Sequence, residues 1–312
     1  MVRSLALLLT VAVVAPGGAA ASRAPAAPAA RGVHVQGSWM APNANANDPW
    51  LYVAGFANNV ISVYDVSAFP APLIGQLTGV PTPAGITLDA QGNLYVATYG
   101  HNTVLVYPPG ASSPSLVLSK GLRDVVDVAV DVNGDVYAFC RTTTPKISVF
   151  AAGQSKPART IASNLFEHPM ALKFDGDRNL YIADFYLAVS ELPFGAQAPL
   201  SLGLADIEHT RGIAPDPQTA KLFANVDLTT KGRQTAVWPP GHARTKRFLN
   251  GGNVESDYLA FGTIGESEYL FVSIYNTNQV LVYKHNSDNV FATMNTASSD
   301  AEGIAFKPAS VP

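Results

Sequence analysis

Short apolar runs with an aromatic residue in second place recur along the chain. Each run combines aliphatic, aromatic and small residues over four positions and is bounded by turn-forming residues. These features predict short β-strands, because helices need about ten or more residues with a 3.6-residue period. Six runs follow one another at intervals of 42 to 48 residues, beginning at Leu51, Leu94, Val136, Leu180, Leu222 and Leu270.

A further strand is predicted before five of these runs. Turn residues such as Gln91-Gly92-Asn93 separate the two strands, which predicts antiparallel hairpins. We expect the aspartates that close these preceding strands, such as Asp89 and Asp216, to cap the turns. The preceding strands cover residues 85–89, 128–131, 172–175, 213–216 and 259–262. The run at Leu51 has no clear predecessor, and the missing strand is found near residues 302–307.

A third strand follows each run, and a more polar fourth strand comes next. Five of the six third strands end in an aromatic residue, which we interpret as core packing. Four short antiparallel strands repeated every 42 to 48 residues describe a propeller blade. The sequence therefore predicts an all-β, six-bladed β-propeller with four antiparallel strands per blade, closed by a C-terminal strand at about 302–307 that joins the first blade. An open β-solenoid and a β-sandwich are the alternatives, and neither accounts for the split repeat.

The N-terminus has the pattern of an export signal. Arg3 precedes an apolar stretch at residues 5–15, which is short for a membrane span, and small residues follow at 19–21. We predict a signal peptide at residues 1–21, an Ala/Pro-rich disordered linker at 22–32 and a single propeller domain at 33–312. An uncleaved anchor is the alternative. The expected location is secreted, periplasmic or in the cell envelope, with no membrane span after signal removal.

Charge and cysteine content exclude several kinds of function. The 20 Lys+Arg against 23 Asp+Glu give a formal net charge of −3, so nucleic acid is not an expected partner. The one cysteine, Cys140, excludes an internal disulfide framework and a zinc site built from several cysteines. An alternative to simple packing is that Cys140 is a nucleophile activated by Arg141. We expect the protein to be a monomer.

Residues 83–110 carry the most regular copy of the blade. They read PAGITLDAQGNLYVATYGHNTVLVYPPG, with a Gly-Asn turn, a Leu-Tyr-Val-Ala strand and a Val-Leu-Val-Tyr strand. This pattern resembles the NHL-type repeat, and the resemblance spans the six blades. Two enzyme groups share the blade pattern, the senescence-marker/gluconolactonase family and the streptogramin lyases, as do many binding propellers without catalytic activity. The resemblance implies the fold and leaves the chemistry to be argued from the site.

The first strand of each blade lines the central channel, so the residues just before that strand lie at one mouth of the channel. The register of the repeats places several polar residues there. The six first strands are aligned on one apolar residue in each. Four residues before this aligned residue, the blades carry Thr82, Asp124, His168, His209, Glu255 and Asp300. Two residues before it, they carry Ala84, Val126, Met170, Arg211, Asp257 and Glu302. The ends of the second strands bring Thr98, Cys140, Arg141, Asp184, Asp227 and Tyr275 to the same face.

These mouth residues define the candidate site. Because histidine titrates near neutral pH, His168 and His209 are the candidate catalytic acid–base groups. The candidate ligand-binding residues are Asp124, Arg211, Glu255, Asp257 and Asp300. The alternative is that each is an ordinary solvated or ion-paired residue, with Arg211 beside Asp257 and Glu302.

The family resemblance adds a metal hypothesis. Members of the gluconolactonase family hold a divalent cation with a Glu before one first strand and an Asp at the end of a second strand, positions that Glu302 and Asp184 match. Met170 and Arg211 stand where that family has Asn, and a guanidinium group repels a cation. The streptogramin lyases need magnesium and use His and Glu, for which the nearest matches are His168, His209 and Glu302. The cofactor implied by these resemblances is Ca²⁺ or Mg²⁺.

The prediction from the sequence is an exported binding module that takes a small molecule or a protein at the channel mouth. The alternative function is a metal-dependent lactone hydrolase or a C–O lyase. A third hypothesis, a purely structural envelope protein, predicts no concave pocket at either mouth.

Overall fold

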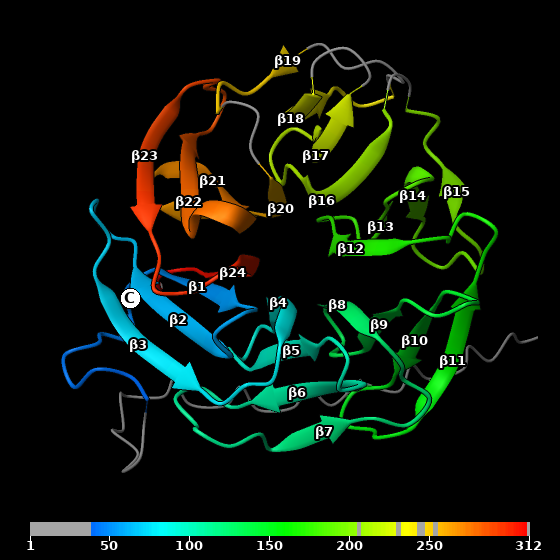
Figure 1. Cartoon of the computed structure of the whole chain (residues 1–312), viewed down its shortest axis with the longest axis horizontal. Coiled ribbons are helices and arrows are strands. Elements are labelled where there is room, and N and C mark those ends of the chain that lie inside the picture. The colour runs from blue at the N-terminus through cyan, green and yellow to red at the C-terminus, as the bar shows by residue number, and fades with distance from the viewer. Residues whose placement is uncertain (1–38, 205–206, 229–231, 242–246, 252–254, 311–312) are drawn as a thin grey trace, which may run out of the picture. The chain divides into compact units, whose positions relative to one another are not determined.

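The computed structural model describes residues 39–204, 207–228, 232–241, 247–251 and 255–310. Within these ranges the chain forms six four-stranded antiparallel sheets arranged in a ring around a central channel (Figure 1). The described residues also include one short 3₁₀ helix, η1 (Tyr275–Thr277), and no helix among them has the length and apolar character needed to cross a membrane. The predicted signal peptide at 1–21 and linker at 22–32 lie outside the described residues.

Each sheet is one blade, and the blades are numbered here in chain order. Blade 1 contains β24 (Ala301–Lys307), β1 (Trp50–Gly55), β2 (Val60–Asp65) and β3 (Leu73–Thr78). Blade 2 contains β4 (Pro83–Leu88), β5 (Leu94–Thr98), β6 (Thr103–Tyr107) and β7 (Leu116–Leu118). Blade 3 contains β8 (Val125–Val130), β9 (Val136–Cys140), β10 (Lys146–Phe150) and β11 (Pro157–Ala162). Blade 4 contains β12 (Pro169–Phe174), β13 (Leu180–Asp184), β14 (Ala188–Leu192) and β15 (Leu200–Ser201). Blade 5 contains β16 (His209–Pro215), β17 (Leu222–Leu228), β18 (Gly232–Trp238) and β19 (Arg247–Phe248). Blade 6 contains β20 (Ser256–Ile264), β21 (Ser267–Ile274), β22 (Gln279–Lys284) and β23 (Val290–Asn295).

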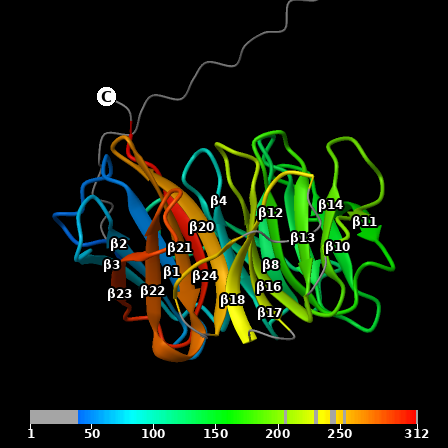
Figure 2. The ribbon, with the colours of Figure 1, turned by 90° about the horizontal axis from the view of Figure 1, so that it is seen from above.

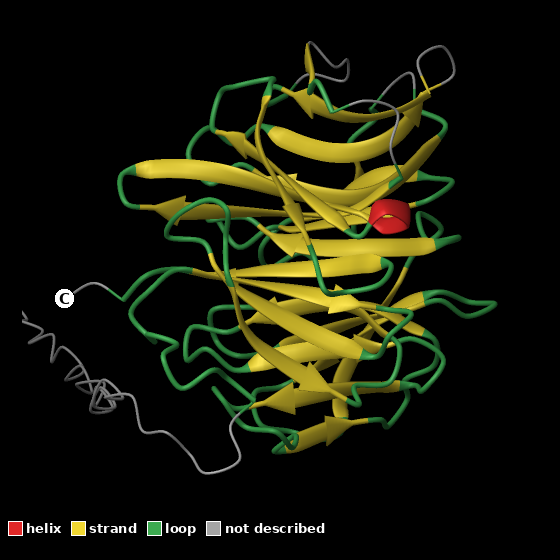
Figure 3. Ribbon diagram, turned by 60° about the vertical axis from the view of Figure 1, so that its left-hand side comes forward, coloured by secondary structure: helices red, strands yellow, loops and turns green. Residues whose placement is uncertain are grey.

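The ring closes through the last strand, as the split repeat predicted. β24 pairs antiparallel with β1, so that Leu51 lies opposite Phe306 and Val53 opposite Ile304. In Figure 1 the red β24 lies beside the blue β1, with the inner strands of the other blades around it. Figures 2 and 3 show the strands running between two opposite faces of the ring, where loops connect them. The six-bladed fold and its closure are therefore confirmed.

Each inner strand is interrupted by a register shift near the candidate mouth, for example between Thr210 and Ile213 in β16. The same shift occurs in all six blades and has the geometry of a β-bulge. The inner strands continue past this shift, so they begin one to four residues earlier, nearer the mouth, than the sequence predicted. Arg211, Asp257 and Glu302 occupy the bulge positions of their blades, and a bulge re-aims the side chain that it carries.

Apolar side chains fill the space between neighbouring blades. Between blades 5 and 6, for example, Phe223 packs with Leu259 and Leu270. Gly212 lies where its blade meets the next one, and a Cβ atom there would overlap the carbonyl oxygen of Asp257. The aromatic residues that end the third strands are at most 5% exposed, which confirms their predicted packing role; they are Tyr64, Tyr107, Phe150, Trp238 and Tyr283.

The aspartates that close the inner strands cap the hairpin turns, as predicted. Asp89 Oδ1 accepts the backbone N–H groups of Gln91 at 2.9 Å and Asn93 at 2.8 Å. Corresponding bonds are made by Asp131, Asp175 and Asp216. These turns lie at the end of the channel opposite the candidate site, because each inner strand runs from the mouth to its aspartate.

Candidate functional site

The side chain of Tyr258 crosses the central channel. Tyr258 comes from β20 in blade 6, is 4% exposed, and its hydroxyl donates to the carbonyl oxygen of Val126 at 3.0 Å. The hydroxyl also lies 3.4 Å from the carbonyl oxygen of Met170. Val126 and Met170 belong to β8 and β12, across the channel from β20 (Figure 1). Burial raises the pKa of this phenol well above its usual value, so the hydroxyl keeps its proton and remains a donor.

Two arginines and two carboxylates interact at the mouth. Arg211 Nη1 donates to Asp257 Oδ1 at 3.2 Å, and the two side chains are 20% and 7% exposed. Burial raises the pKa of Asp257 to about 6, while the positive charge of Arg211 opposes the rise. Burial and then the charge on Asp257 raise the pKa of Glu302 well above its usual range, while Arg141 and Arg211 oppose this rise. With both carboxyls ionised, the formal charges of these four side chains cancel.

Several polar atoms in this group of four have no hydrogen-bond partner within the described part of the chain. The Nε atoms of Arg141 and Arg211 are buried without an acceptor. The Glu302 side chain is partly exposed and lies near the charges of Asp257, Arg141 and Arg211. Since a buried unsatisfied polar group costs about 1–3 kcal/mol, the group favours an added molecule that both donates and accepts hydrogen bonds.

His168 is neutral and is bound by Arg141. Arg141 Nη1 lies 2.9 Å from His168 Nε2, and because a guanidinium group only donates, Nε2 is the acceptor. Burial and then the positive charge of Arg141 lower the pKa of His168. The lone pair that a general base would use is therefore occupied by Arg141 in this arrangement, and His168 fixes the position of that arginine.

His209 belongs to a network of charged side chains between blades 5 and 6. Its Nδ1 lies 3.2 Å from Asp227 Oδ2, and Arg233 Nε lies 3.5 Å from Asp227 Oδ1. Arg233 also pairs with Glu255. The His209 ring stacks on Phe185 with 4.1 Å between ring centroids. A carboxylate at Nδ1 leaves Nε2 as the nitrogen that can accept a proton, so His209 keeps the geometry of a candidate base.

The sequence did not predict the aromatic side chains of the mouth. Phe185 and Tyr186 directly follow β13, and their ring centroids lie 5.0 Å apart. Phe185 also lies 5.5 Å from the His168 ring, and the Arg211 guanidinium carbon is 5.2 Å from the Phe185 ring centre. Tyr186 is 53% exposed. The sequence signal for them was a pair of adjacent aromatic residues in a turn. A turn residue on the surface packs into no core, so such a pair indicates a binding surface.

Asp184 is bound to the backbone of the loops around it, and it is 1% exposed. Its two carboxylate oxygens accept four backbone N–H groups at 2.8 to 3.2 Å, those of Glu167, His168, Tyr186 and Leu187. Asp184 thus positions the loops that carry His168 and Tyr186. Among the described residues, no group of three potential metal ligands combines Asp184 with Glu302.

Asp124 and Asp300 lie at junctions between blades, each directly before an inner strand. Both have left-handed backbones, with φ of 46° and 51°. The backbone N–H of Asp124 donates to Asn102 Oδ1 at 2.8 Å, and that of Asp300 donates to Asn278 Oδ1 at 2.9 Å. An asparagine of one blade therefore fixes the start of the next inner strand. At these two positions the backbone has a defined structural role, and their carboxylates remain candidate ligand-binding groups.

Cys140 is fully buried in the core between blades 2 and 3. Burial raises the pKa of its thiol, which disfavours the reactive thiolate. This environment supports the packing interpretation of Cys140 over the nucleophile.

A cavity of about 250 Å³ lies at the other end of the channel. Its walls come from the inner strands and are largely apolar, with Phe174, Phe261 and Phe306 among the lining residues and Lys173 as the cationic one. The third hypothesis, a purely structural protein, predicted no concave pocket at either mouth, so this cavity counts against it.

Comparison with known proteins supports the fold and identifies no family. No protein-family model matches the chain, and no curated protein matches it. A chain in the crystal structure of a nidogen/laminin complex superimposes with a TM-score of 0.71 at 15% identity, over 83% of this chain and 98% of that chain. Hydrazine synthase from Kuenenia stuttgartiensis superimposes with a TM-score of 0.56 at 14% identity, over 82% and 80% of the respective chains. At these identities the likeness concerns the propeller fold alone.

Proposed function

We propose that the protein is an exported binding module that takes an uncharged, hydroxyl-rich small molecule at the channel mouth. The observation that carries this proposal is the pair of buried, unpartnered Nε atoms of Arg141 and Arg211, beside the partly exposed carboxyl of Glu302. A hydroxyl group donates and accepts at once, so it matches a group of side chains that lacks both kinds of partner. With both carboxyls ionised, the two arginines balance their charge, and an uncharged ligand leaves this balance unchanged.

The aromatic side chains support the same ligand class. Phe185 stacks on His209 and lies beside Arg211, and next to it the 53% exposed Tyr186 offers its ring to the apolar side of a cyclic ligand. Because the Tyr258 side chain crosses the channel, a ligand at this site enters from the mouth side. The nidogen/laminin complex makes a protein partner the alternative occupant.

The proposal is tested by calorimetry and thermal shift with uncharged monosaccharides, aldonolactones and polyols, beside amino sugars and sugar acids of the same size. We expect saturable binding of at least one uncharged compound and at least tenfold weaker binding to the Glu302→Gln variant. Glu191→Gln is the matched control, since Glu191 is a half-buried carboxylate in β14, away from the mouth. Preference for the charged analogues, or full binding by Glu302→Gln, would contradict the proposal.

Activity assays on the same purified protein and variants test the enzyme hypothesis. The NHL-type blade pattern is similar to that of lactone hydrolases and streptogramin lyases, so lactones and cyclic depsipeptides are assayed with Mg²⁺, Ca²⁺, Mn²⁺ and Zn²⁺. Metal-dependent turnover that Glu302→Ala abolishes would replace the binding module by a hydrolase or lyase. Binding without turnover supports the module.

Export rests on the N-terminal pattern and has its own test. If residues 1–21 are a cleaved signal, the protein recovered from the medium or envelope fraction begins near Ser22, and Edman sequencing or intact mass measurement identifies that end. Recovery of a chain that retains residues 1–21 in the membrane fraction would support the anchor instead.

A further inference from the structure

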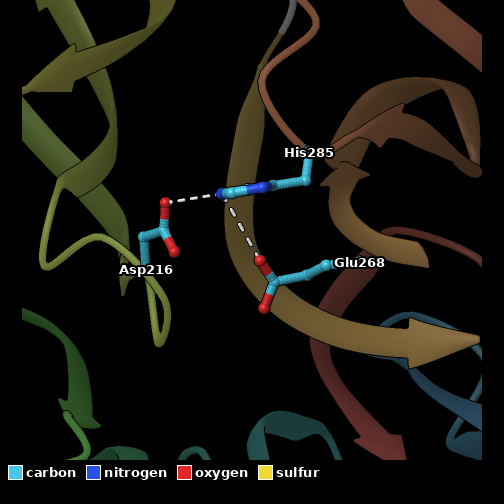
Figure 4. A group of neighbouring side chains, drawn as sticks. All are labelled: Asp216, Glu268 and His285. Atoms are coloured by element: carbon cyan, nitrogen blue, oxygen red, sulfur yellow. Dashed lines mark hydrogen bonds and ion pairs between the residues drawn. The ribbon is translucent and has the colours of Figure 1, made fainter. Parts of the chain in front are cut away.

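Asp216, Glu268 and His285 converge at the end of the propeller opposite the mouth (Figure 4). Asp216 follows the inner strand β16 of blade 5, Glu268 lies at the start of β21, and His285 follows β22 in blade 6. His285 Nε2 lies 2.9 Å from Asp216 Oδ2 and 3.4 Å from Glu268 Oε2. The side chains of Asp216, Glu268 and His285 are 0%, 3% and 13% exposed.

One of the two carboxylates is not satisfied by the protein. Glu268 Oε2 is buried, has no hydrogen-bond partner within the described residues, and points at the imidazole of His285 (Figure 4). The Asp216 carboxylate lies close by and is 0% exposed, so two acidic side chains stand near each other out of water. Such a pair calls for a cation between or beside the carboxylates.

Asp216 also departs from the other turn caps. In blades 2 and 4 the second oxygen of the capping aspartate accepts from an asparagine of its own turn, Asn93 at 2.7 Å and Asn179 at 2.9 Å. Blade 5 has no asparagine in that turn, and Asp216 Oδ2 accepts from the Thr219 hydroxyl of the turn while it also faces His285 of the next blade. The turn keeps its cap through Oδ1, so Oδ2 is directed toward the junction of two blades.

We propose that Asp216, Glu268 and His285 bind one divalent transition-metal ion of the Zn²⁺ class that joins blades 5 and 6. Ligand atoms about 2.1 Å from a metal lie about 3.0 Å apart at right angles and about 3.4 Å apart at the tetrahedral angle. The distance from His285 Nε2 to Glu268 Oε2 is 3.4 Å, and the distance to Asp216 Oδ2, 2.9 Å, is close to the lower of these two values. A water molecule supplies the fourth ligand.

The donor set selects the class of metal. One imidazole nitrogen with two carboxylate oxygens suits Zn²⁺ and its neighbours in the first transition row, whereas Ca²⁺ and Mg²⁺ prefer oxygen ligands alone. Two carboxylates also neutralise the charge of a divalent ion. Outer contacts hold the ligands in place: the Thr219 hydroxyl donates to Asp216 Oδ2, and the Asn286 amide lies 3.0 Å from His285 Nδ1. In the structure Asn286 Nδ2 faces His285 Nδ1, and Asn286 Oδ1 accepts from Lys221 Nζ at 3.2 Å. With a metal on Nε2 the imidazole proton moves to Nδ1, so metal binding requires the Asn286 amide to turn its oxygen toward Nδ1.

In the test, the full chain is freed of metal with EDTA and dialysed, each ion is added back and its excess removed, and metal content and melting temperature are then measured. We expect one Zn²⁺ or Co²⁺ per chain by elemental analysis, a melting temperature that rises with the concentration of either ion, and no such rise with Ca²⁺ or Mg²⁺. Bound Co²⁺ should also give the visible absorption of a four-coordinate site.

Two variants locate the ion. Glu268→Gln keeps the size of the side chain and removes no hydrogen bond of Oε2, so the variant should fold and bind Zn²⁺ more than about 100-fold more weakly, beyond the loss typical of an outer contact. His285→Gln should do the same. The matched controls are Glu191→Gln and His101→Gln, a half-buried carboxylate and an exposed imidazole elsewhere, and both should bind as the unmodified chain does. The proposal is overturned if the unmodified chain binds no stoichiometric ion, or if both site variants bind it unchanged.

Discussion

Asp127 shows how one buried acid connects neighbouring blades. It lies in β8, is 1% exposed, and its carboxylate accepts the backbone N–H of Val128 at 2.8 Å and that of Leu172 in blade 4 at 2.7 Å. On the other side it packs against Gly85 of blade 2, where a Cβ atom would overlap the carboxylate. Burial raises the pKa of Asp127 to about 7, although Lys173 and the two hydrogen bonds oppose the rise.

The raised pKa of Asp127 predicts a pH-dependent stability. Between the unfolded value near 3.8 and the folded value of about 7, the native state holds more protons than the unfolded state, so the free energy of unfolding falls as pH rises through this window. The Asp127→Asn variant lacks this titration. We expect its free energy of unfolding, relative to the unmodified chain, to improve by roughly 2–4 kcal/mol from pH 4 to pH 8 in urea titrations. A difference that stays constant across this range would contradict the prediction.

Tyr258 offers a second prediction at the scale of one residue. In Tyr258→Phe the ring remains and the bond to the Val126 carbonyl is lost, so we expect a loss of about 1 kcal/mol of unfolding free energy. Tyr258→Ala empties the channel at this level and should cost about 3–5 kcal/mol. Urea denaturation of both variants checks this order. Equal losses would mean that the ring does not fill the channel.

At the scale of elements, asparagine side chains of one blade bind the backbone just before the inner strand of the next. Asn102 has a left-handed backbone, with φ of 61°, and its Oδ1 accepts the N–H that begins the approach to β8. Asn59 makes the same contact with Thr82, before β4. The contact therefore recurs where one blade passes the chain to the next.

Two substitutions separate the parts played by Asn102. Asn102→Gly tolerates the left-handed backbone and loses only the hydrogen bond, so we expect a loss of about 1 kcal/mol. Asn102→Ala loses the bond and also strains the backbone, which should add about 1 kcal/mol or more. Chemical denaturation of the two variants measures the difference. If the glycine variant is as stable as the unmodified chain, the bond does not hold the junction.

The sequence contained the elements of the fold and only part of the site. The run at Leu51 without a predecessor was enough to predict that β24 closes the ring, because a strand pairs by a local and repeated pattern. The period also placed Arg211 and Asp257 at the same mouth. It did not reveal that Asp184 turns toward backbone N–H groups, because the direction of a side chain depends on the turn that follows it. Nor did it bring His285 to Asp216, since no local pattern encodes a contact between blades.

At the scale of the whole molecule, the ring is held by the one sheet that combines both ends of the propeller. β24 supplies the buried side chains of Ala301 and Ile304 and gives β1 a hydrogen-bonded neighbour. Lys307 Nζ then donates to the carbonyl oxygens of Ala46 at 2.7 Å and Asp48 at 3.0 Å, which fastens the strand to the segment before β1. Opening this sheet exposes the edge of β1 and removes the support that β24 gives to β20 and β4 on either side.

Removal of β24 should therefore disrupt the entire propeller and not blade 1 alone. A chain ending at Asp300 leaves the edge of β1 unpaired, and we expect it to aggregate or to lose its cooperative melting transition. A chain ending at Pro308 keeps β24 and loses, among the described residues, one backbone bond, from the Ser310 N–H to the Asn47 carbonyl oxygen. Its unfolding free energy should therefore change by about 1 kcal/mol at most. A synthetic peptide covering residues 299–310, added during refolding of the shorter chain, should restore the transition by pairing with β1. If the chain ending at Asp300 melts as the full chain does, closure by β24 is not what stabilises the ring.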